Sequence, residues 1–321
     1  MQNSSLVLTK YVSWLRHSEG INLSDKLLLF FIKLYYLALI TFIRLALGKT
    51  RSKRLILKRG LDFEAVWYKS YSFWKREEKE SHELLKFKMP KHDFEFYCRK
   101  NKDDFKTMTF HEDDILNYHF TPKEGDIVID VGAHIGKYTI IASKRVGTTG
   151  KVIAIEAHPG NYEILNSNIK LNRLTNVISL NYAVYSKETI IKLFLPDEKS
   201  NHTIYNTLIQ TRAKDEEKFV EVNADTLDNL LQRNGISNAE VNWLKIDVEG
   251  AELEVLKGAQ AIISNSKRIA LLIEVHNIEQ GKNLYMPIMD LLQKYNFKIE
   301  FEKIYATNEK HVVLRKKMPV L

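Results

Sequence analysis

The 321-residue sequence predicts an α/β fold with a mostly parallel sheet, a C-terminal antiparallel hairpin and an N-terminal helical extension. The first observation is that short apolar, β-branched runs alternate with helix-like stretches from residue 125 onwards. Such βαβ repeats form parallel sheets with right-handed crossovers. The second is that two strand-like segments joined by the polar turn TNEK follow this pattern. The third is a long apolar run near the N-terminus, which predicts a separate helix.

The apolar run at residues 27–47 is long enough to cross a bilayer at about 1.5 Å per residue. Lys33 and Arg44 interrupt it, and on a helix they lie within about 20° of each other. The run therefore predicts a helix with a narrow cationic stripe and a broad apolar face. Mostly polar residues precede it, which argues against a secretory signal. Three placements of this helix are open: in the plane of a membrane surface, packed on the body of the protein, or across the membrane. Because RSKRLILKR follows, we expect peripheral membrane contact through residues 26–59.

The net charge of +8 is concentrated in the N-terminal segment. Residues 1–60 contain 11 Lys and Arg against two acids, or +9, and the other 261 residues contain 37 against 38, or −1. A body that coats nucleic acid would be basic throughout, so this class of protein is disfavoured. The single Cys98 excludes a disulfide framework and a CxxC metal site, and it fits a reducing compartment.

The predicted elements follow one another in three parts of the chain: 1–60, an accessory region at 61–121, and a main domain at 122–321. The accessory region has a strand-like alternation at 92–99 and a short helical pattern at 110–120. In the main domain, the expected parallel strands are 126–131, 151–156, 176–184, 241–250 and 269–276. Helices are expected at about 136–146, 160–172, 251–263 and 284–295. The expected hairpin is 297–306 with 311–317, and an insertion holds 189–196, 218–222 and a helix from Asp225.

Carboxylates occur where the predicted strands end, which is the edge at which open α/β sheets bind ligands. The strand ends are Asp130 to Gly136, Glu156, Asn181 to Val184, Asp247 to Gly250 and Glu274 to His276. Gly132 and Gly136 permit a tight turn close to a ligand, and Glu156 suits two ribose hydroxyls. The spacing lacks the third glycine of a dinucleotide-binding GxGxxG, which disfavours a dinucleotide enzyme.

The spacing Gly-x-x-x-Gly directly after Asp130 resembles motif I of class I S-adenosylmethionine methyltransferases. The terminal hairpin resembles the edge of their Rossmann-like fold. The resemblance narrows to the FkbM-type family over about residues 110–280, carried by the segments DVGAHIGKYT, EAHPGNY, NYAV, DTLDNL, LKIDVEGAELEVLKGA and IEVH. It implies an O-methyltransferase (EC 2.1.1) that uses S-adenosyl-L-methionine on hydroxyls of sugars, glycolipids or polyketide-like products. Residues 1–60 lie outside it.

The resemblance implies that the turn after Asp130 borders the methionine part of the cofactor, that Glu156 holds its ribose and that the region of Ala183 borders its adenine. The full set of predicted cofactor-binding residues is Asp130, Gly132, Ala133, His134, Gly136, Glu156, Ala183 and Asp247.

The predicted catalytic residues are Asp247, Glu249, Glu274 and His276, at the ends of two neighbouring strands. We expect Asp247 to face the cofactor, His276 to accept the acceptor's proton in its neutral form, and Glu249 to orient it. A base, a substrate clamp and a metal pair all remain open roles, and Asp247 has a structural alternative as a helix N-cap. We assign no metal ligand, although this many carboxylates makes a divalent ion conceivable.

The sequence thus predicts a methyltransferase for a small-molecule or lipid-linked glycan acceptor, located in the cytoplasm at the inner membrane face. Two alternatives stay open: a cofactor-binding adaptor without turnover, and a nucleic-acid methyltransferase. No nucleic-acid partner is expected, because the body is near neutral and the sequence lacks an Asp/Asn-Pro-Pro-Tyr/Phe motif for base flipping. Acceptor specificity is expected to reside in 195–217 and 61–121.

Overall fold

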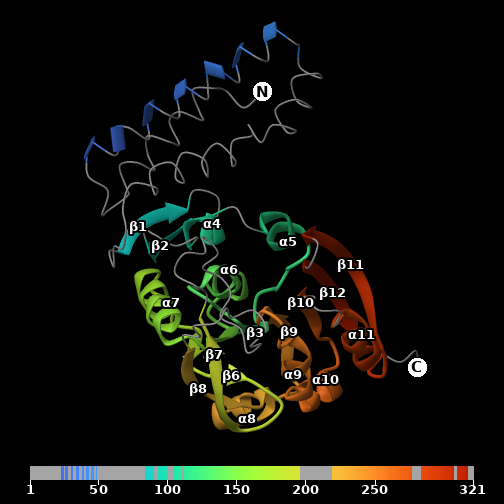
Figure 1. The fold of residues 1–321 in the computed structure, drawn as a ribbon. Coiled ribbons are helices and arrows are strands. Elements are labelled where there is room, and N and C mark those ends of the chain that lie inside the picture. The colour runs from blue at the N-terminus through green and yellow to red at the C-terminus, as the bar shows by residue number, and fades with distance from the viewer. Residues whose placement is uncertain are drawn as a thin grey trace. The chain divides into compact units, whose positions relative to one another are not determined.

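A computed structural model of the chain forms two compact units, residues 1–111 and 112–321 (Figure 1). It describes separate residues between 23 and 48, and the segments 84–89, 93–99, 104–109, 112–195, 219–276, 283–306 and 309–316. The described residues between 23 and 48 are helical, which agrees with the helix predicted there. Lys33, Arg44 and the basic cluster that follows lie outside the described residues.

The first unit contains a hairpin of β1 (Leu84–Met89) and β2 (Phe94–Arg99) followed by the short helix α4 (Asp104–Thr109). The two strands are antiparallel. The rings of Phe87, Phe96 and Phe105 pack with centroids 4.8 to 6.1 Å apart. Two side-chain bonds of 2.8 Å join the Arg99 guanidinium to the Asp104 carboxylate. The strand predicted at 92–99 is therefore present as β2.

The second unit is built on a seven-stranded sheet in the order β11-β12-β10-β9-β3-β4-β5. Its parallel strands are β3 (Ile127–Val131), β4 (Lys151–Ile155), β5 (Val177–Leu180), β9 (Val241–Ile246) and β10 (Ala270–His276). The strands β11 (Phe297–Ala306) and β12 (Glu309–Lys316) form the antiparallel hairpin, and β12 pairs antiparallel with β10. This arrangement confirms the predicted α/β fold with a mostly parallel sheet.

A smaller three-stranded sheet holds the insertion, and its order is β6-β8-β7. Its strands are β6 (Ala183–Val184), β7 (Thr189–Phe194) and β8 (Phe219–Asp225). The third strand predicted at 176–184 is therefore divided, because β5 belongs to the large sheet and β6 to the small one. Residues 196–218, which include most of the predicted specificity stretch, lie outside the described residues.

The helices of the second unit are α5 (Asp113–Tyr118), α6 (Lys137–Val146), α7 (Pro159–Leu171), α8 (Leu227–Arg233), α9 (Glu252–Lys257), α10 (Gln260–Asn265) and α11 (Tyr285–Gln293). The single helix predicted at 251–263 is two helices that meet at Gly258. A Cβ at Gly258 would lie 2.1 Å from the carbonyl oxygen of Tyr185, so the helix break packs tightly on another backbone segment. Asp225 ends β8, and the following Thr226 caps α8 through its side chain.

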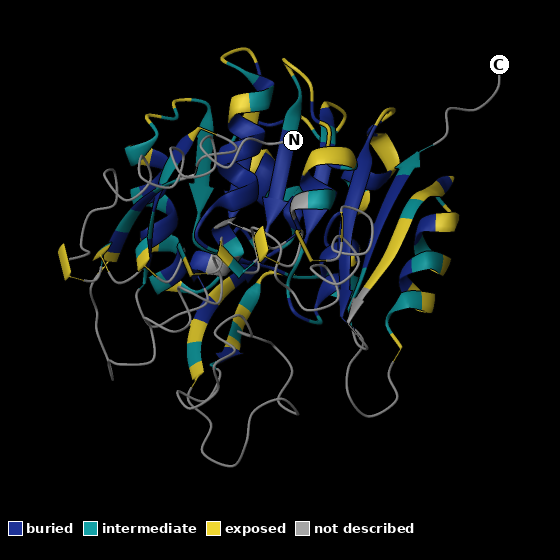
Figure 2. Cartoon of the chain, turned by 90° about the horizontal axis from the view of Figure 1, so that it is seen from above, coloured by how far each residue is buried: buried dark blue, intermediate teal, exposed yellow. Residues whose placement is uncertain are grey.

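The core of the second unit lies on the inner strands of the large sheet. β10 is buried along its whole length, and β3, β4 and β9 are buried over most of theirs (Figure 2). Phe120 packs at 5.2 Å from Tyr138 and 5.1 Å from Trp243. Phe120, near the end of the predicted accessory region 61–121, therefore packs in the core of the second unit.

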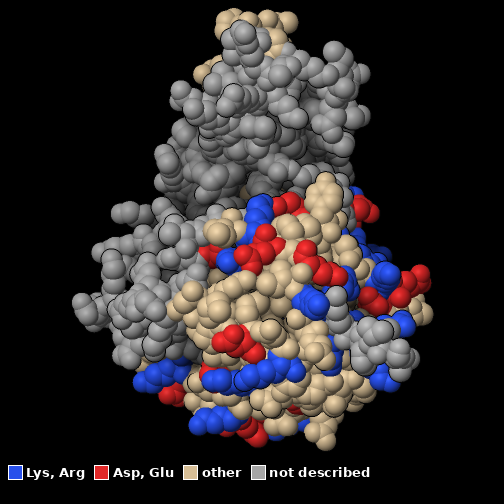
Figure 3. All heavy atoms as spheres, turned by 90° about the vertical axis from the view of Figure 1, so that its right-hand side faces the viewer, with Lys and Arg blue, Asp and Glu red and all other residues tan. Residues whose placement is uncertain are grey.

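The outer face formed around the hairpin carries acidic and basic side chains next to one another (Figure 3). Ion pairs join Arg315 to Glu300 and Lys310 to Glu302, at 2.8 and 2.9 Å. The mixture agrees with the near-neutral charge of the body outside residues 1–60.

Candidate active site

The turn after β3 brings its backbone directly against the end of β9. Gly132 and Gly136 have φ of 78° and 103°, values that glycine adopts without steric cost. A Cβ on Gly132 would lie 1.8 Å from the carbonyl oxygen of Asp247. The amides of Gly132 and Ala133 donate to the carbonyl of Ile155 at 2.9 and 3.0 Å. The turn is therefore held between the ends of two neighbouring strands.

Glu156 follows β4 and connects this turn to the start of α7. Its carboxylate accepts hydrogen bonds from the amides of His134 at 2.8 Å and His158 at 2.9 Å, and from the Asn161 side chain at 3.3 Å. The side chain is buried, and burial raises the pKa of Glu156 although these bonds act in the opposite direction. Glu156 thus presents a desolvated acceptor that is fixed in position by three donors.

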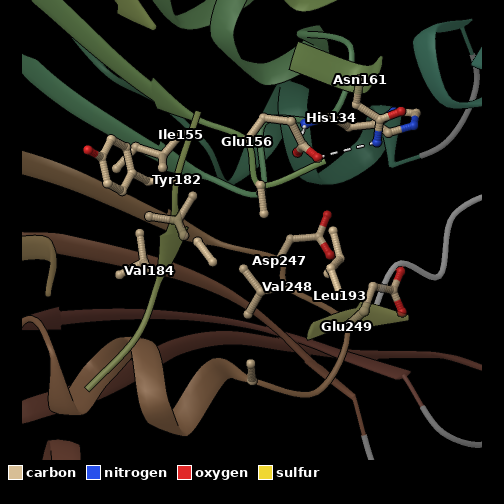
Figure 4. A pocket seen from close by; sticks show the side chains of 15 residues that line it. His134, Ile155, Glu156, Asn161, Tyr182, Val184, Leu193, Asp247, Val248 and Glu249 are labelled. Carbon is tan, nitrogen blue, oxygen red and sulfur yellow. Dashed lines mark hydrogen bonds between the residues drawn. The ribbon is translucent and has the colours of Figure 1, made fainter. Parts of the chain in front are cut away.

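A cleft lies beyond these strand ends (Figure 4). Its wall is partly apolar, and it is lined by Val131, Gly132, His134, Ile155, Glu156, Ala157, Asn161, Tyr182, Ala183, Val184, Leu193, Asp247, Val248, Glu249 and Ala251. The cleft therefore brings together five of the predicted cofactor-binding residues: Gly132, His134, Glu156, Ala183 and Asp247. The other three, Asp130, Ala133 and Gly136, do not line it.

Asp130 is buried behind the cleft and makes contacts within the protein. It accepts a hydrogen bond of 2.6 Å from the Thr139 hydroxyl, and its other oxygen lies 3.3 Å from Nζ of Lys245. The structure therefore places Asp130 where it supports the turn and α6, instead of at the surface of the cleft.

Lys245 is a central residue of this site that sequence reasoning missed. Its Nζ donates to the carbonyl oxygen of Gly132 at 3.0 Å and lies 3.3 Å from carboxylate oxygens of both Asp130 and Asp247. Burial lowers the pKa of Lys245, but the neighbouring Asp247 and Asp130 carboxylates outweigh it and raise the pKa. The sequence did contain a signal for Lys245. It lies within an apolar strand two residues before Asp247, so the two side chains share one face of the strand, and a buried lysine needs a charged partner.

His276, at the end of β10, is surrounded by three carboxylates. Its Nδ1 lies 2.8 Å from Oε1 of Glu252, and its Nε2 lies 3.3 Å from Glu249 and 3.4 Å from Glu274. Burial lowers the pKa of His276, but the surrounding carboxylates outweigh it and hold the pKa well above its ordinary value. His276 is thus held on both ring nitrogens by acidic neighbours, and its expected role as the base for the acceptor's proton stays a prediction.

Glu274 joins this histidine to a second one on the hairpin. The register of β10 and β12 places Glu274 opposite His311, and Oε2 of Glu274 lies 3.1 Å from the His311 ring. His311 also contacts Glu112 at the start of α5. Burial raises the pKa of Glu274, and the Asp247 and Glu112 carboxylates raise it further. Neither Glu112 nor His311 was among the predicted residues.

The four predicted catalytic residues thus divide into two groups. Asp247 and Glu249 line the cleft, whereas Glu274 and His276 do not. Glu249 is buried with a φ of 55°, so the chain turns sharply there, and His276 is only 1% exposed. The expected overhang of His276 at the pocket mouth is therefore replaced by a position behind Glu249. The arrangement offers two carboxylates to a ligand and a set of buried charges that hold them in place.

Solved structures and curated proteins resemble the chain. A SAM-dependent methyltransferase from Aquifex aeolicus is 17% identical with a TM-score of 0.39, over 67% of this chain and 95% of that one. The methyltransferase sdnD of Sordaria araneosa is 31% identical over 47% of this chain and 65% of its own length. The 31-O-demethyl-FK506 methyltransferase FkbM of Streptomyces tacrolimicus is 25% identical over 60% of this chain and 80% of its own.

A third curated protein is the hexuronic acid methyltransferase AglP of Haloferax volcanii, 28% identical over 48% of this chain and 57% of its own length. The chain thus spans less than two thirds of the length of sdnD and of AglP. The profile of the family described as "Methyltransferase FkbM domain" matches residues 130–299, which is more than half of the 321 residues. The chain therefore belongs to the FkbM family of methyltransferases, which use S-adenosylmethionine.

Proposed function

We propose that the protein transfers a methyl group from S-adenosylmethionine to a hydroxyl of a glycan, a glycolipid or a related small molecule. The observation that carries this proposal is the Glu156 carboxylate, held by three donors at the wall of a cleft that the Gly132 turn also lines. AglP, a relative, is described as a hexuronic acid methyltransferase, which favours a sugar-type acceptor.

The residues of the cleft fit the parts of this cofactor. The Oε2 atom of Glu156 accepts one of the three bonds described above, so it retains acceptor capacity for a ribose hydroxyl. Tyr182, Ala183 and Val184 provide an apolar wall suited to an adenine ring. The Gly132 turn allows the backbone to approach a ligand closely. The bound cofactor supplies an electrophilic methyl group on a positively charged sulfur.

Catalysis by the protein then consists of aligning the acceptor oxygen and removing its proton. Asp247 and Glu249 are the two predicted catalytic carboxylates that line the cleft, so they are placed to contact the acceptor. Lys245 holds Asp247 from behind, and Nε2 of His276 lies 3.3 Å from Glu249. We assign Lys245 and His276 as positioning residues for these carboxylates.

The test combines cofactor binding with turnover. Glu156→Ala removes the acceptor for the ribose hydroxyls together with the partner of the His134 and His158 amides, so cofactor affinity should fall by the equivalent of about 1.5–3 kcal/mol. Glu163→Ala, on the exposed face of α7, is the matched control and should bind as the wild type does. Calorimetry that shows equal cofactor affinity in a folded Glu156→Ala variant would contradict the assignment.

Turnover separates an enzyme from the adaptor. The intact protein is incubated with methyl-labelled cofactor and extracts of native glycans and lipids, and the labelled fraction is identified. Label in a glycan or lipid fraction supports the proposal. Cofactor binding with no labelled product would favour the adaptor, and labelled nucleic acid would favour the nucleic-acid methyltransferase.

We further infer that the N-terminal segment attaches the enzyme to an anionic membrane surface, at the cytoplasmic face. Among the described residues, no helix is long and apolar enough to span a bilayer. Phe31, Tyr35, Phe42 and Leu45 are between 61% and 81% exposed, which supports an apolar helix face available to lipid. Changing Arg51, Lys53 and Arg54 together to Glu should weaken binding to anionic vesicles and leave binding to neutral ones nearly unchanged. Equal pelleting with anionic vesicles would contradict it.

A further inference from the structure

The ends of β9 and β10 bring together three side chains that can each offer one ligand atom to a metal ion. These are Asp247, Glu274 and His276, and the three ligand atoms lie within 4.8 Å of one another. Metal–ligand bonds of about 2.1 Å place adjacent ligand atoms about 3 Å apart and opposite ones about 4.2 Å apart. The 3.4 Å between Nε2 of His276 and Oε1 of Glu274 falls within that range. A small contraction of the group would complete the geometry.

The histidine is oriented as metal-binding histidines are. Its Nδ1 contacts the fully buried Glu252 at 2.8 Å, while its Nε2 faces Glu249 and Glu274. In metal sites, the ring nitrogen that does not bind the ion commonly donates to a carboxylate, which fixes the ring orientation. Glu252 is that carboxylate here, so Nε2 is the atom that faces the proposed ion.

The charge balance around these residues independently favours a cationic ligand. The connected set of side chains contains six acids and three bases: Glu112, Asp130, Asp247, Glu249, Glu252 and Glu274, with Lys245, His276 and His311. The set thus contains twice as many acids as bases. Within the described part of the chain, the buried Oε2 of Glu252 has no hydrogen-bond partner. Because uncompensated buried charge is costly, a bound cation would stabilise the cluster.

In a second trio, Glu112, Glu274 and His311, the three ligand atoms also lie within 4.8 Å of one another. All three of its members are buried, and none of them lines the cleft. In the first trio, the Asp247 side chain is 26% exposed and lines the cleft, which gives an ion a path of entry. The first trio is therefore the one that can serve a ligand in the cleft.

We propose that Asp247, Glu274 and His276 bind a divalent metal ion at the wall of the cleft, with Glu249 beside it as a further ligand. Two carboxylates and one imidazole form a donor set suited to Mn²⁺. Its open positions face the cleft, where the ion holds the acceptor oxygen and lowers the pKa of the hydroxyl that is methylated. This role rests on the proposed function, whereas the binding of the ion does not.

The test is a titration of the full chain with Mn²⁺, after bound metal and then the chelator have been removed. Binding is measured as the loss of the free Mn²⁺ signal in electron paramagnetic resonance. We expect one ion per chain. Asp247→Asn and His276→Ala should each weaken binding at least tenfold. The control His119→Ala removes a histidine that stacks on Phe301 and belongs to neither trio, and this variant should bind as the wild type does. Thermal melting shows which variants are folded, and Asp247→Asn keeps the test valid if the buried His276 variant unfolds.

Two results would overturn the metal site: no specific Mn²⁺ binding by the wild type, or equal affinity in the folded Asp247→Asn variant. Cofactor calorimetry in the presence of chelator separates this failure from that of the proposed function. Retained cofactor binding without metal binding removes the metal site alone, whereas absent cofactor binding removes the proposed function. Once the acceptor is known, methyl transfer is measured with and without chelator. If Mn²⁺ binds without chelator but the rate of methyl transfer is the same in both conditions, the ion's role at the acceptor is overturned.

Discussion

Gly132→Ala is the substitution whose effect can be worked out most directly from the geometry. The added Cβ would lie 1.8 Å from the carbonyl oxygen of Asp247, and contacts below 3.0 Å essentially do not occur, so one of the two chain segments must move by at least 1.2 Å. The φ of 78° adds strain, because an L side chain rarely adopts this conformation. Both segments line the cleft, so the movement displaces the groups that we propose contact the cofactor.

The expected magnitude has two parts. The left-handed conformation costs roughly 1–2 kcal/mol for alanine, and forcing a methyl group into a packed position costs roughly 1–3 kcal/mol. The total of about 2–5 kcal/mol corresponds to a fall in Tm of roughly 4–20 °C for a unit of this size. A displacement of about 1 Å at a binding site can lower activity by about 10²-fold, so cofactor affinity should fall as well.

Gly235→Ala is a matched control for the conformational part. Gly235 has a φ of 68°, and a Cβ there would meet no atom within 4 Å. Its variant should lose roughly 1–2 kcal/mol and bind the cofactor normally. Thermal melting and calorimetry of both variants measure the difference. If Gly132→Ala is no less stable than Gly235→Ala and binds the cofactor equally well, the argument from the close approach to Asp247 is refuted.

Three further predictions concern buried charge. Burial raises the pKa of Glu156, so its carboxylate should gain a proton at a pH above the ordinary carboxyl range. Cofactor affinity measured by calorimetry should therefore fall as the pH is lowered into that range, and Glu156→Gln should remove this pH dependence. Burial lowers the pKa of His311, but its contacts with Glu112 and Glu274 outweigh this and raise the pKa to about 10. The folded state therefore favours the protonated ring, and its stabilisation is complete below about pH 6.5 and lost towards pH 10. Urea titrations across this range should show the loss in the wild type and a flatter profile in His311→Gln. Lys245→Met should cost about 3–5 kcal/mol in the same assay, because Asp130 is left buried without its cation. A loss below 1 kcal/mol would contradict the pairing.

The sequence by itself determined the order of strands and helices. It also determined which residue types follow the first two parallel strands, a glycine-containing turn and an acid. The alternation of apolar runs with helical stretches is a local property, so it predicted the parallel sheet and its terminal hairpin correctly. The glycine spacing after Asp130 and the acid at Glu156 are also local. They were sufficient to predict a tight turn close to a ligand at this edge of the sheet, and Gly132 and Glu156 both line the cleft found there.

Tertiary structure alone decided which charges meet behind the cleft. The contact of Lys245 with Asp130 depends on the register between β9 and β3, and that of His311 with Glu274 depends on the register between β12 and β10. Residues so distant in sequence give no local pattern that reports their pairing. The raised pKa of His276 likewise arises only in the folded chain, where the surrounding carboxylates outweigh the effect of burial. The physical reason is that desolvation and charge–charge distances are properties of three-dimensional packing.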